Sequence, residues 1–255
     1  MSKQINSDDI FDAFQSLAKD NVELLPVQFK SRVTGAQYEP LYNLIHKYVA
    51  ENSRVLDWGC GNGHFSYFAV KCGFQTHAYS FANEALIRFL EENFSSSFEY
   101  STARDADPVN LPFTAESYNV VTSVGVLEHV RETGGDERAS MKEINRVLIP
   151  GGLFICGHFP NKYSYIEKIN SKIPSQHHHV YKYIRADIEE FCNDTGFEIL
   201  ETGRYGFIPR NCWNRLPVRM SQSNTVSATV RYFDTIFKYL FPRYCQNHYF
   251  VAQKK

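Results

Sequence analysis

Three glycines at alternate positions are the first feature of this sequence that can do chemistry. Gly59, Gly61 and Gly63 follow a predicted strand at 54–58 and precede a predicted helix at 64–70. Backbone N–H groups without neighbouring side chains, together with the positive end of a helix, are suited to hold a ligand closely. The spacing differs from the G-x-G-x-x-G of dinucleotide sites, and no Gly-Lys-Ser/Thr of a phosphate loop is present. A tight turn is the alternative, but the strand and the helix favour a binding loop.

Histidines are the second group of candidate residues, because imidazole, with an ordinary pKa of about 6.5, transfers protons readily at neutral pH. His129 follows a predicted strand at 118–124, and His158 ends another at 152–158. Open α/β sheets bind ligands at the carboxyl ends of their strands, so both histidines are candidate catalytic bases. The structural alternatives are a backbone-bonded histidine at a helix start for His129 and a buttress of the loop for His158.

Short apolar runs that alternate with helical stretches must position these residues. This pattern predicts an α/β, Rossmann-like fold: a seven-stranded, mostly parallel sheet with helices on both faces. The last strand follows the sixth through a long excursion, so we predict that it runs antiparallel. The strands are predicted at 54–58, 75–79, 98–102, 118–124, 152–158, 197–202 and 249–253. Further helices are predicted at 84–93, 136–148 and 185–195.

Two helical additions flank this core. Amphipathic helices at 7–19 and 39–49 predict an N-terminal helical cap over 1–50, ahead of the main domain over 51–255. Residues 205–248, before the last strand, are too many for a connection without structure, and they predict a helical insertion or lid.

One helix of this insertion has a clear apolar stripe. The stripe consists of Val226, Val230, Phe233, Phe237 and Leu240, and the charged residues off it are Arg231, Asp234 and Lys238. We interpret it as packing on the core. The alternative is a lid or a peripheral membrane-interface helix that admits a lipid-like acceptor.

Composition disfavours several classes of function. Lys plus Arg number 27 against 28 acidic residues, which disfavours binding to a nucleic-acid backbone. Six scattered cysteines without a C-x-x-C pair indicate reduced thiols and a cytoplasmic protein. The sequence has neither a transmembrane run nor the pattern of a signal peptide. Nothing in it sets an oligomeric state.

Five segments together resemble the class I S-adenosylmethionine-dependent methyltransferases, of the type found in ubiquinone biosynthesis. They are residues 55–63, 111–113, 118–121, 126–130 and 146–152. The resemblance covers about residues 38–204 and the final strand, and it implies that S-adenosylmethionine is the cofactor.

The resemblance also implies a set of cofactor-binding residues. The methionine end of the cofactor would lie on Asp57, Gly59, Cys60, Gly61 and Gly63, with Val124 and Gly125 nearby. Asp105 and Ala106 match the pair that reads the adenine edge, with Asp107 as a competing alignment. Ser80 stands where the family has an acid for the ribose hydroxyls, and a hydroxyl makes weaker hydrogen bonds than a carboxylate. Glu84 is an alternative, although a helix start explains it.

By the same resemblance, His179 in the run 177–179 lies nearest the acceptor and joins His129 and His158 as a candidate base. Some relatives bind a divalent ion through Glu-x-x-Glu-His and a later His. Here Glu128, His129 and His179 match, but Gly125 replaces the first Glu. Because this replacement removes a charged ligand, we expect no metal.

The function expected is transfer of a methyl group to a small molecule, by O-methylation of a metabolite, a glycan precursor or a quinone-like phenol. Late aromatic residues could line a pocket for a ring-shaped acceptor, although they are also ordinary core residues. The alternatives are a metal-assisted methyltransferase for RNA ends and a cofactor-binding sensor or partner subunit without catalysis. Ser80 favours the sensor, whereas Gly125 and the neutral charge balance disfavour the RNA enzyme.

Overall fold

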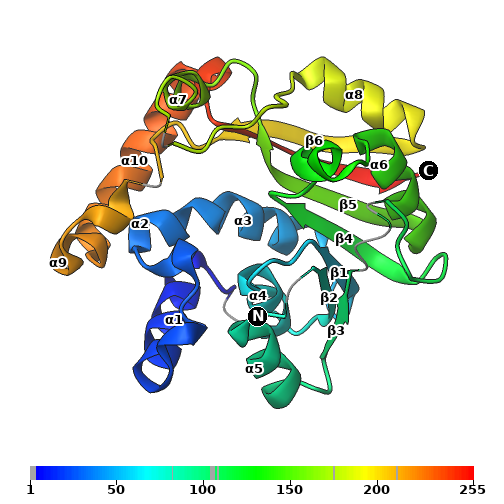
Figure 1. The fold of residues 1–255 in the computed structure, drawn as a ribbon, viewed down its shortest axis with the longest axis horizontal. Helices are drawn as coiled ribbons and strands as arrows, with labels where there is room; N and C mark the ends of the chain where they lie inside the picture. Colours follow the sequence, from blue (N-terminus) through cyan, green and yellow to red (C-terminus); the bar gives the residue numbers. More distant parts are fainter. Residues whose placement is uncertain (1–3, 82, 104–106, 108, 175, 211) are drawn as a thin grey trace.

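A computed structural model describes residues 4–81, 83–103, 107, 109–174, 176–210 and 212–255. Its seven-stranded sheet has the strand order β3-β2-β1-β4-β5-β7-β6 (Figure 1). The strands are β1 (Arg54–Trp58), β2 (Gln75–Ser80), β3 (Phe98–Thr102), β4 (Tyr118–Val124), β5 (Leu148–Pro160), β6 (Phe197–Tyr205) and β7 (Asn247–Lys254). Only β7 pairs antiparallel, with β5 and β6. The predicted fold class and the antiparallel last strand are confirmed.

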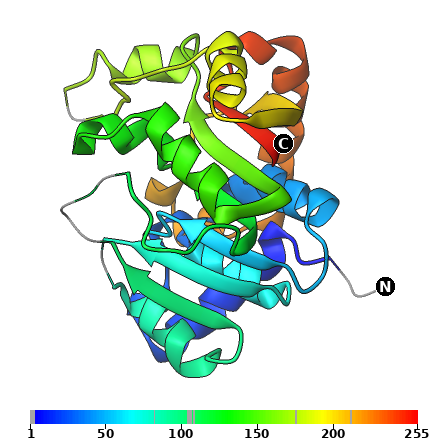
Figure 2. The same ribbon diagram turned by 90° about the vertical axis from the view of Figure 1, so that its right-hand side faces the viewer.

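Helices cover both faces of the sheet (Figures 1 and 2). They are α1 (Ser7–Asp20), α2 (Arg32–Gly35), α3 (Glu39–Tyr48), α4 (His64–Lys71), α5 (Ala85–Asn93), α6 (Glu137–Val147), α7 (Tyr165–Asn170), α8 (Arg185–Asp194), α9 (Val218–Ser221) and α10 (Asn224–Leu240). Neighbouring strand residues point to opposite faces. Val55 therefore belongs to a core that includes residues of α1, α3, α4 and α5, whereas Leu56 belongs to one that includes residues of α6 and α8.

The N-terminal helices form close to the predicted positions. Asn6 caps α1 by accepting a hydrogen bond from the Asp9 N–H, and Phe11 and Phe14 on its apolar face are buried. Arg32 of α2 forms an ion pair with Asp8 of α1 and donates a hydrogen bond to the carbonyl of Gln222. This N-terminal region is thereby attached to the insertion before β7.

The structure contains two short helices near the carboxyl ends of the strands that the sequence analysis does not predict. The 3-10 helix η4 (Leu127–Thr133) follows β4, and α7 follows β5. The fifth strand is also longer than predicted, because it begins at Leu148 and continues to Pro160. Leu148, predicted as the end of a helix, thus begins a strand, and the residues after β4 and β5 form helical elements near the carboxyl edge of the sheet.

The insertion is helical as predicted, but its main helix packs differently. It contains η5 (Trp213–Arg215), α9, α10 and η6 (Pro242–Tyr244). Phe237 stacks on Phe207, yet Phe233 and Leu240 of the predicted stripe are 46% and 64% exposed. The interpretation that the whole stripe packs on the core is therefore wrong. Among the described residues, no helix is both long and apolar enough to cross a membrane.

Candidate active site

The glycine loop between β1 and α4 depends on its three glycines in two different ways. Gly59, Gly61 and Gly63 have φ angles of +73°, +53° and +82°, which side chains rarely tolerate. A Cβ atom on Gly59 would lie 2.3 Å from Cγ2 of Val126, and one on Gly63 would lie 2.6 Å from Cδ1 of Ile87. A Cβ atom on Gly61 would approach only the Gly59 carbonyl, at 4.0 Å. Packing therefore requires the outer glycines, whereas Gly61 borders open space.

Asp57 lies at the base of this loop. Its carboxylate is 1% exposed and accepts hydrogen bonds from the hydroxyls of Ser66, at 2.6 Å, and Thr122, at 3.2 Å. Burial raises the pKa of Asp57 to about 6, and these two hydrogen bonds oppose the shift. The side chain thus connects β1 to α4 and β4, and these hydrogen bonds hold the start of the glycine loop in place.

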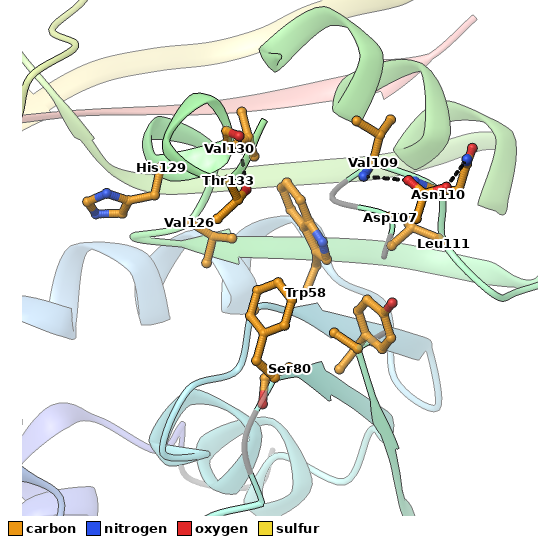
Figure 3. Close-up of a pocket in the computed structure, with 14 residues that line it drawn as sticks. Trp58, Ser80, Asp107, Val109, Asn110, Leu111, Val126, His129, Val130 and Thr133 are labelled. Atoms are coloured by element: carbon orange, nitrogen blue, oxygen red, sulfur yellow. Dashed lines mark hydrogen bonds between the residues drawn. The ribbon is translucent and has the colours of Figure 1, made fainter. Parts of the chain in front are cut away.

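A cavity opens beside the loop, at the carboxyl ends of β1, β2 and β4 (Figure 3). It is lined by Trp58, Gly59, Tyr79, Ser80, Phe81, Ala103, Asp107, Val109, Asn110, Leu111, Val126, His129, Val130 and Thr133. Figure 3 shows Trp58 between Ser80 and Thr133, with Asp107 and Asn110 toward one end and His129 toward the other. The cavity thus extends from His129 of η4 to Asp107 and Asn110.

Among the predicted cofactor residues, Gly59 and Ser80 line this cavity directly. The Ser80 hydroxyl also forms a hydrogen bond with the thiol of Cys60, whose pKa burial raises to about 12. Cys60 is therefore an uncharged thiol at neutral pH. Trp58 and Tyr79 also line the cavity but were not predicted, although each directly precedes a predicted residue.

Asp105 and Ala106 lie outside the described residues, so their predicted adenine contact has no structural description. The competing Asp107 does line the cavity. Its carboxylate accepts hydrogen bonds from the N–H groups of Asn110 and Val109, and these bonds lower its pKa. Asp107 is therefore a charged acceptor at the far end of the cavity from His129.

Val124 and Gly125 end β4, and Gly125 separates two groups of histidines. Gly125 has a φ angle of +77°. A Cβ atom there would lie 3.8 Å from Oε1 of Glu128 and 3.9 Å from Cβ of His158. The missing side chain thus leaves the Glu128 side and the His158 side of the strand end close to each other.

The first group is an open cluster, defined as Glu128, His129, His177 and His179. The imidazole nitrogens of the three histidines lie within 4.8 Å of one another. Glu132 and Glu167 each bind Nδ1 of one of them, His129 and His179, at 3.0 Å. The Nε2 atoms of these two rings therefore face Glu128, each 4.0 Å from its Oε1.

Glu128 is the buried member of the open cluster. It is 2% exposed, and its Oε2 has no hydrogen-bond partner. Burial raises its pKa to about 8, although its own backbone N–H and the charge of Arg210 lower it. Burial also raises the pKa of Glu167, but hydrogen bonds from His179 outweigh burial and lower it to about 2. Next to the open cluster, the charged carboxylate of Glu167 thus orients His179, whereas Glu128 inside the cluster has one oxygen without a hydrogen-bond partner.

The second group is a closed cluster, defined as Tyr38, His64, His158, Tyr205 and Arg210. His158 is 4% exposed, and its Nδ1 lies 2.8 Å from the Tyr205 hydroxyl. Arg210 reaches His158 from the insertion, with Nη1 3.0 Å from Nε2. Burial and then the charge of Arg210 lower the pKa of His158 well below its usual value. This imidazole is neutral, and both of its nitrogens have hydrogen-bond partners. These features favour the interpretation that His158 buttresses the loop over the interpretation that it is a catalytic base.

His177 is the member of the open cluster that sequence reasoning missed. In the run 177–179, only His179 is predicted to lie near the acceptor. His177 stands beside His129 and His179, with ring centroids 6.1 and 5.0 Å away. The sequence contains a sign of this role, because His177 and His179 are two positions apart. Alternate residues of an extended segment point to the same side.

Comparisons with known proteins agree with this geometry. Residues 29–202 match the family of methyltransferase domains. A ubiquinone biosynthesis O-methyltransferase of Burkholderia pseudomallei is 27% identical, with 69% of this chain and 81% of that protein covered. An eEF1A lysine and N-terminal methyltransferase of Bos taurus is 28% identical over 47% of this chain, which spans 18% of that protein.

A solved structure shares the fold. It is the 1,6-didemethyltoxoflavin-N1-methyltransferase of Burkholderia thailandensis, with bound 1,6-didemethyltoxoflavin and S-adenosylhomocysteine. It superposes with a TM-score of 0.58 and 14% identity, and 96% of this chain and 87% of that chain are covered.

Proposed function

This chain belongs to the class I S-adenosylmethionine-dependent methyltransferases, and from that premise we propose that it methylates a hydroxyl group of a small molecule beside the open cluster. Its cofactor is S-adenosylmethionine. The observation that carries the proposal is the orientation of two imidazoles, because Glu132 and Glu167 bind Nδ1 of His129 and His179 and turn both Nε2 atoms inward.

The glycine loop and the cavity fit the cofactor. Gly61 offers open space for the methionine end, and the apolar ring of Trp58 lies beside the cavity for the nucleoside. Asp107 and Asn110 supply polar groups at the end away from His129. When bound, the cofactor supplies a methyl group on a positively charged sulfur, which leaves as an uncharged thioether.

The chain's own residues align the acceptor and take its proton. His129 lines the cavity, and its Nε2 is the atom that would accept the proton as the acceptor oxygen forms its bond to the methyl carbon. Alignment can supply roughly 7–11 kcal/mol and a positioned base roughly 10²–10⁴ in rate. The neutral His158 of the closed cluster, already bonded by Tyr205 and Arg210, has no part in this step.

The related O-methyltransferase supports oxygen as the acceptor atom, whereas the eEF1A relative methylates a protein. Transfer of labelled methyl from S-adenosylmethionine to a cell extract, followed by separation into small molecules and macromolecules, distinguishes the two. We expect label in the small-molecule fraction, in a product that carries a methyl ether. Label confined to protein or RNA would overturn the small-molecule proposal, and binding without any transfer would favour a sensor.

The cofactor site is tested separately by calorimetry with S-adenosylmethionine. Gly61→Ala places a methyl group in the open space, so we expect at least a tenfold loss of affinity, about 1.4 kcal/mol. Gly73→Ala is the matched control, because Gly73 also has a positive φ, +84°, and no atom within 4 Å of its missing Cβ, but lies outside the cavity lining. Equal losses in both variants would show that strain, and not the ligand, determines the result.

One observation favours a second candidate, a metal-assisted transfer. The donor set fits a metal ion such as Zn²⁺, since three imidazoles converge next to a buried carboxyl group with an unpaired oxygen. Glu132 and Glu167 hold Nδ1 of two of these rings, as outer partners of metal-bound histidines commonly do. His129, His177 and His179 would hold the ion, which would lower the pKa of an acceptor hydroxyl.

His177 separates the two candidates, because only the metal needs it. We would titrate Co²⁺ as a coloured substitute and record its visible absorption in the wild type, in His177→Ala and in His178→Ala. Tight binding that only His177→Ala abolishes supports the metal. Absence of binding, with methyl transfer unaffected by His177→Ala, supports His129 as the base.

A further inference from the structure

The helix α10 exposes no charged side chain to the solvent. Its exposed residues are Asn224, Thr225, Ala228, Thr229, Tyr232, Phe233, Thr235, Tyr239 and Leu240, and none of them is charged. Tyr232 and Tyr239 are 64% and 76% exposed. A surface helix normally directs its charged face to water. The outward face of α10 is therefore suited to surroundings less polar than water.

The charged residues of α10 face the protein instead. Arg231 forms an ion pair with Asp8 of α1 at 2.9 Å, and Asp234 accepts a hydrogen bond from the N–H of Ile208 at 2.6 Å. Together with Lys238 they line a cavity shared with the N-terminal helices. These contacts fix the rotation of α10, so its uncharged face, with Tyr232, Phe233 and Tyr239, is held outward by the fold.

Basic residues border this uncharged face. Residues 205–248 contain six basic residues and one acidic residue, although the whole chain has a net charge of −1. Arg215, Arg219 and Arg243 are exposed, on η5, α9 and η6, next to α10 in sequence. In Figure 1, α7, α10 and α9 follow one another along one edge of the molecule.

A basic concavity adjoins η6 on the same edge. Lys162, Lys168, Lys182 and Arg243 line it, together with hydroxyl groups that include that of Tyr163. Its single acidic residue, Glu167, is buried and bonded to His179. An anionic group such as a phosphate would be attracted to this concavity.

These features favour one occupant of the face. A second copy related by a two-fold axis would bring two basic insertions together, and their charges would repel. A bilayer with anionic lipids offers an apolar layer for the aromatic side chains and negative headgroups for the arginines and lysines. Tyr at the outer face also suits the boundary between lipid and water.

We propose that the insertion 205–248 binds the surface of an anionic membrane, with the outward face of α10 in the headgroup region and lipid phosphate in the concavity of Lys162, Lys168, Lys182 and Arg243. This binding is peripheral. It goes beyond the proposed methyl transfer and does not depend on it.

Co-sedimentation with vesicles tests the proposal. We expect the protein to sediment with vesicles of phosphatidylcholine containing about one third phosphatidylglycerol, and not with phosphatidylcholine alone. Phe233→Ser with Tyr239→Ser should weaken binding at least about tenfold. Lys168→Gln with Arg243→Gln should weaken it by about fivefold per residue, and salt should weaken it further.

The control is Lys19→Gln with Val22→Ser, which removes one exposed positive charge and one exposed apolar side chain from the N-terminal region. We expect this variant to bind as the wild type does. Circular dichroism and thermal unfolding identify any variant that fails to fold. Equal binding to neutral and anionic vesicles, or none to either, would overturn the proposal. So would a concentration-dependent dimer in sedimentation velocity that the α10 substitutions abolish, because a second copy would then cover this face.

Discussion

The open and the closed cluster use the same residue type at the same edge of the sheet, with opposite results. In the closed cluster, burial and Arg210 keep His158 neutral, and Tyr205 and Arg210 occupy its nitrogens. In the open cluster, carboxylates bind only Nδ1 of His129 and His179, and the Nε2 atoms remain directed at Glu128. Position at the end of a strand therefore does not decide whether a histidine is available for chemistry. Its partners and its burial do.

The largest effect should come from His129 in the open cluster. His129→Gln removes the proposed base, so we expect kcat to fall roughly 10²–10⁴-fold, about 3–5 kcal/mol, with little change in the affinity for S-adenosylmethionine. Initial rates over a range of acceptor concentrations measure this. His178→Gln, in the same loop but outside the cluster, is the control. A comparable loss of kcat in a stably folded His158→Gln would contradict the difference between the clusters.

The closed cluster should instead make stability depend on pH. Burial, followed by the charge of Arg210, lowers the pKa of His64 to about 3, whereas the unfolded chain keeps it at about 6.5. The unfolded state thus binds the additional proton, so this stability is present above pH 6.5 and is lost as the pH falls toward 3.

His64→Phe should remove this dependence. Between pH 6 and pH 4 the free energy of unfolding of the wild type should fall, relative to that of the variant, by about 1.4 kcal/mol per pH unit. Urea unfolding at several pH values gives both curves. Parallel curves would mean that His64 is protonated in the folded protein.

A smaller effect is expected for the hydrogen bonds of the closed cluster. The Tyr205 hydroxyl accepts a hydrogen bond from the backbone N–H of His158 at 2.6 Å, and it also forms a hydrogen bond with Nδ1 of the His158 ring. Tyr205→Phe should lower the free energy of unfolding by about 1–3 kcal/mol, because buried polar groups lose their partner. The kcat of the folded enzyme should change by less than about twofold. A large loss of kcat with unchanged stability would assign the closed cluster to catalysis.

The smallest effect concerns His64 at neutral pH. Both of its ring nitrogens are buried without a hydrogen-bond partner, and its ring lies 4.5 Å from that of Tyr38. His64→Phe at pH 7.5 should therefore raise the free energy of unfolding by up to about 1 kcal/mol. Thermal unfolding measures it, and a clear destabilisation would indicate an essential polar contact of this ring.

The sequence allowed the fold and the glycine loop to be predicted because both depend on local patterns. The strand before Gly59 and the helix after Gly63 are contiguous in the chain, so their spacing carries the geometry. The environment of His158 could not be predicted, since Arg210 lies 52 residues further along the chain. The orientation of α10 was also missed, because an apolar stripe does not specify whether it faces the core or the outside.

Gly125 lies between the open and the closed cluster, and it has no side chain to separate them. Arg210, fixed on the side of His158, still lowers the pKa of Glu128 on the other side, against the larger effect of burial. The pKa of Glu128 is therefore set partly by a guanidinium that the helical insertion carries. A ligand or surface that displaces this insertion would therefore raise the pKa of Glu128 without contacting Glu128 itself.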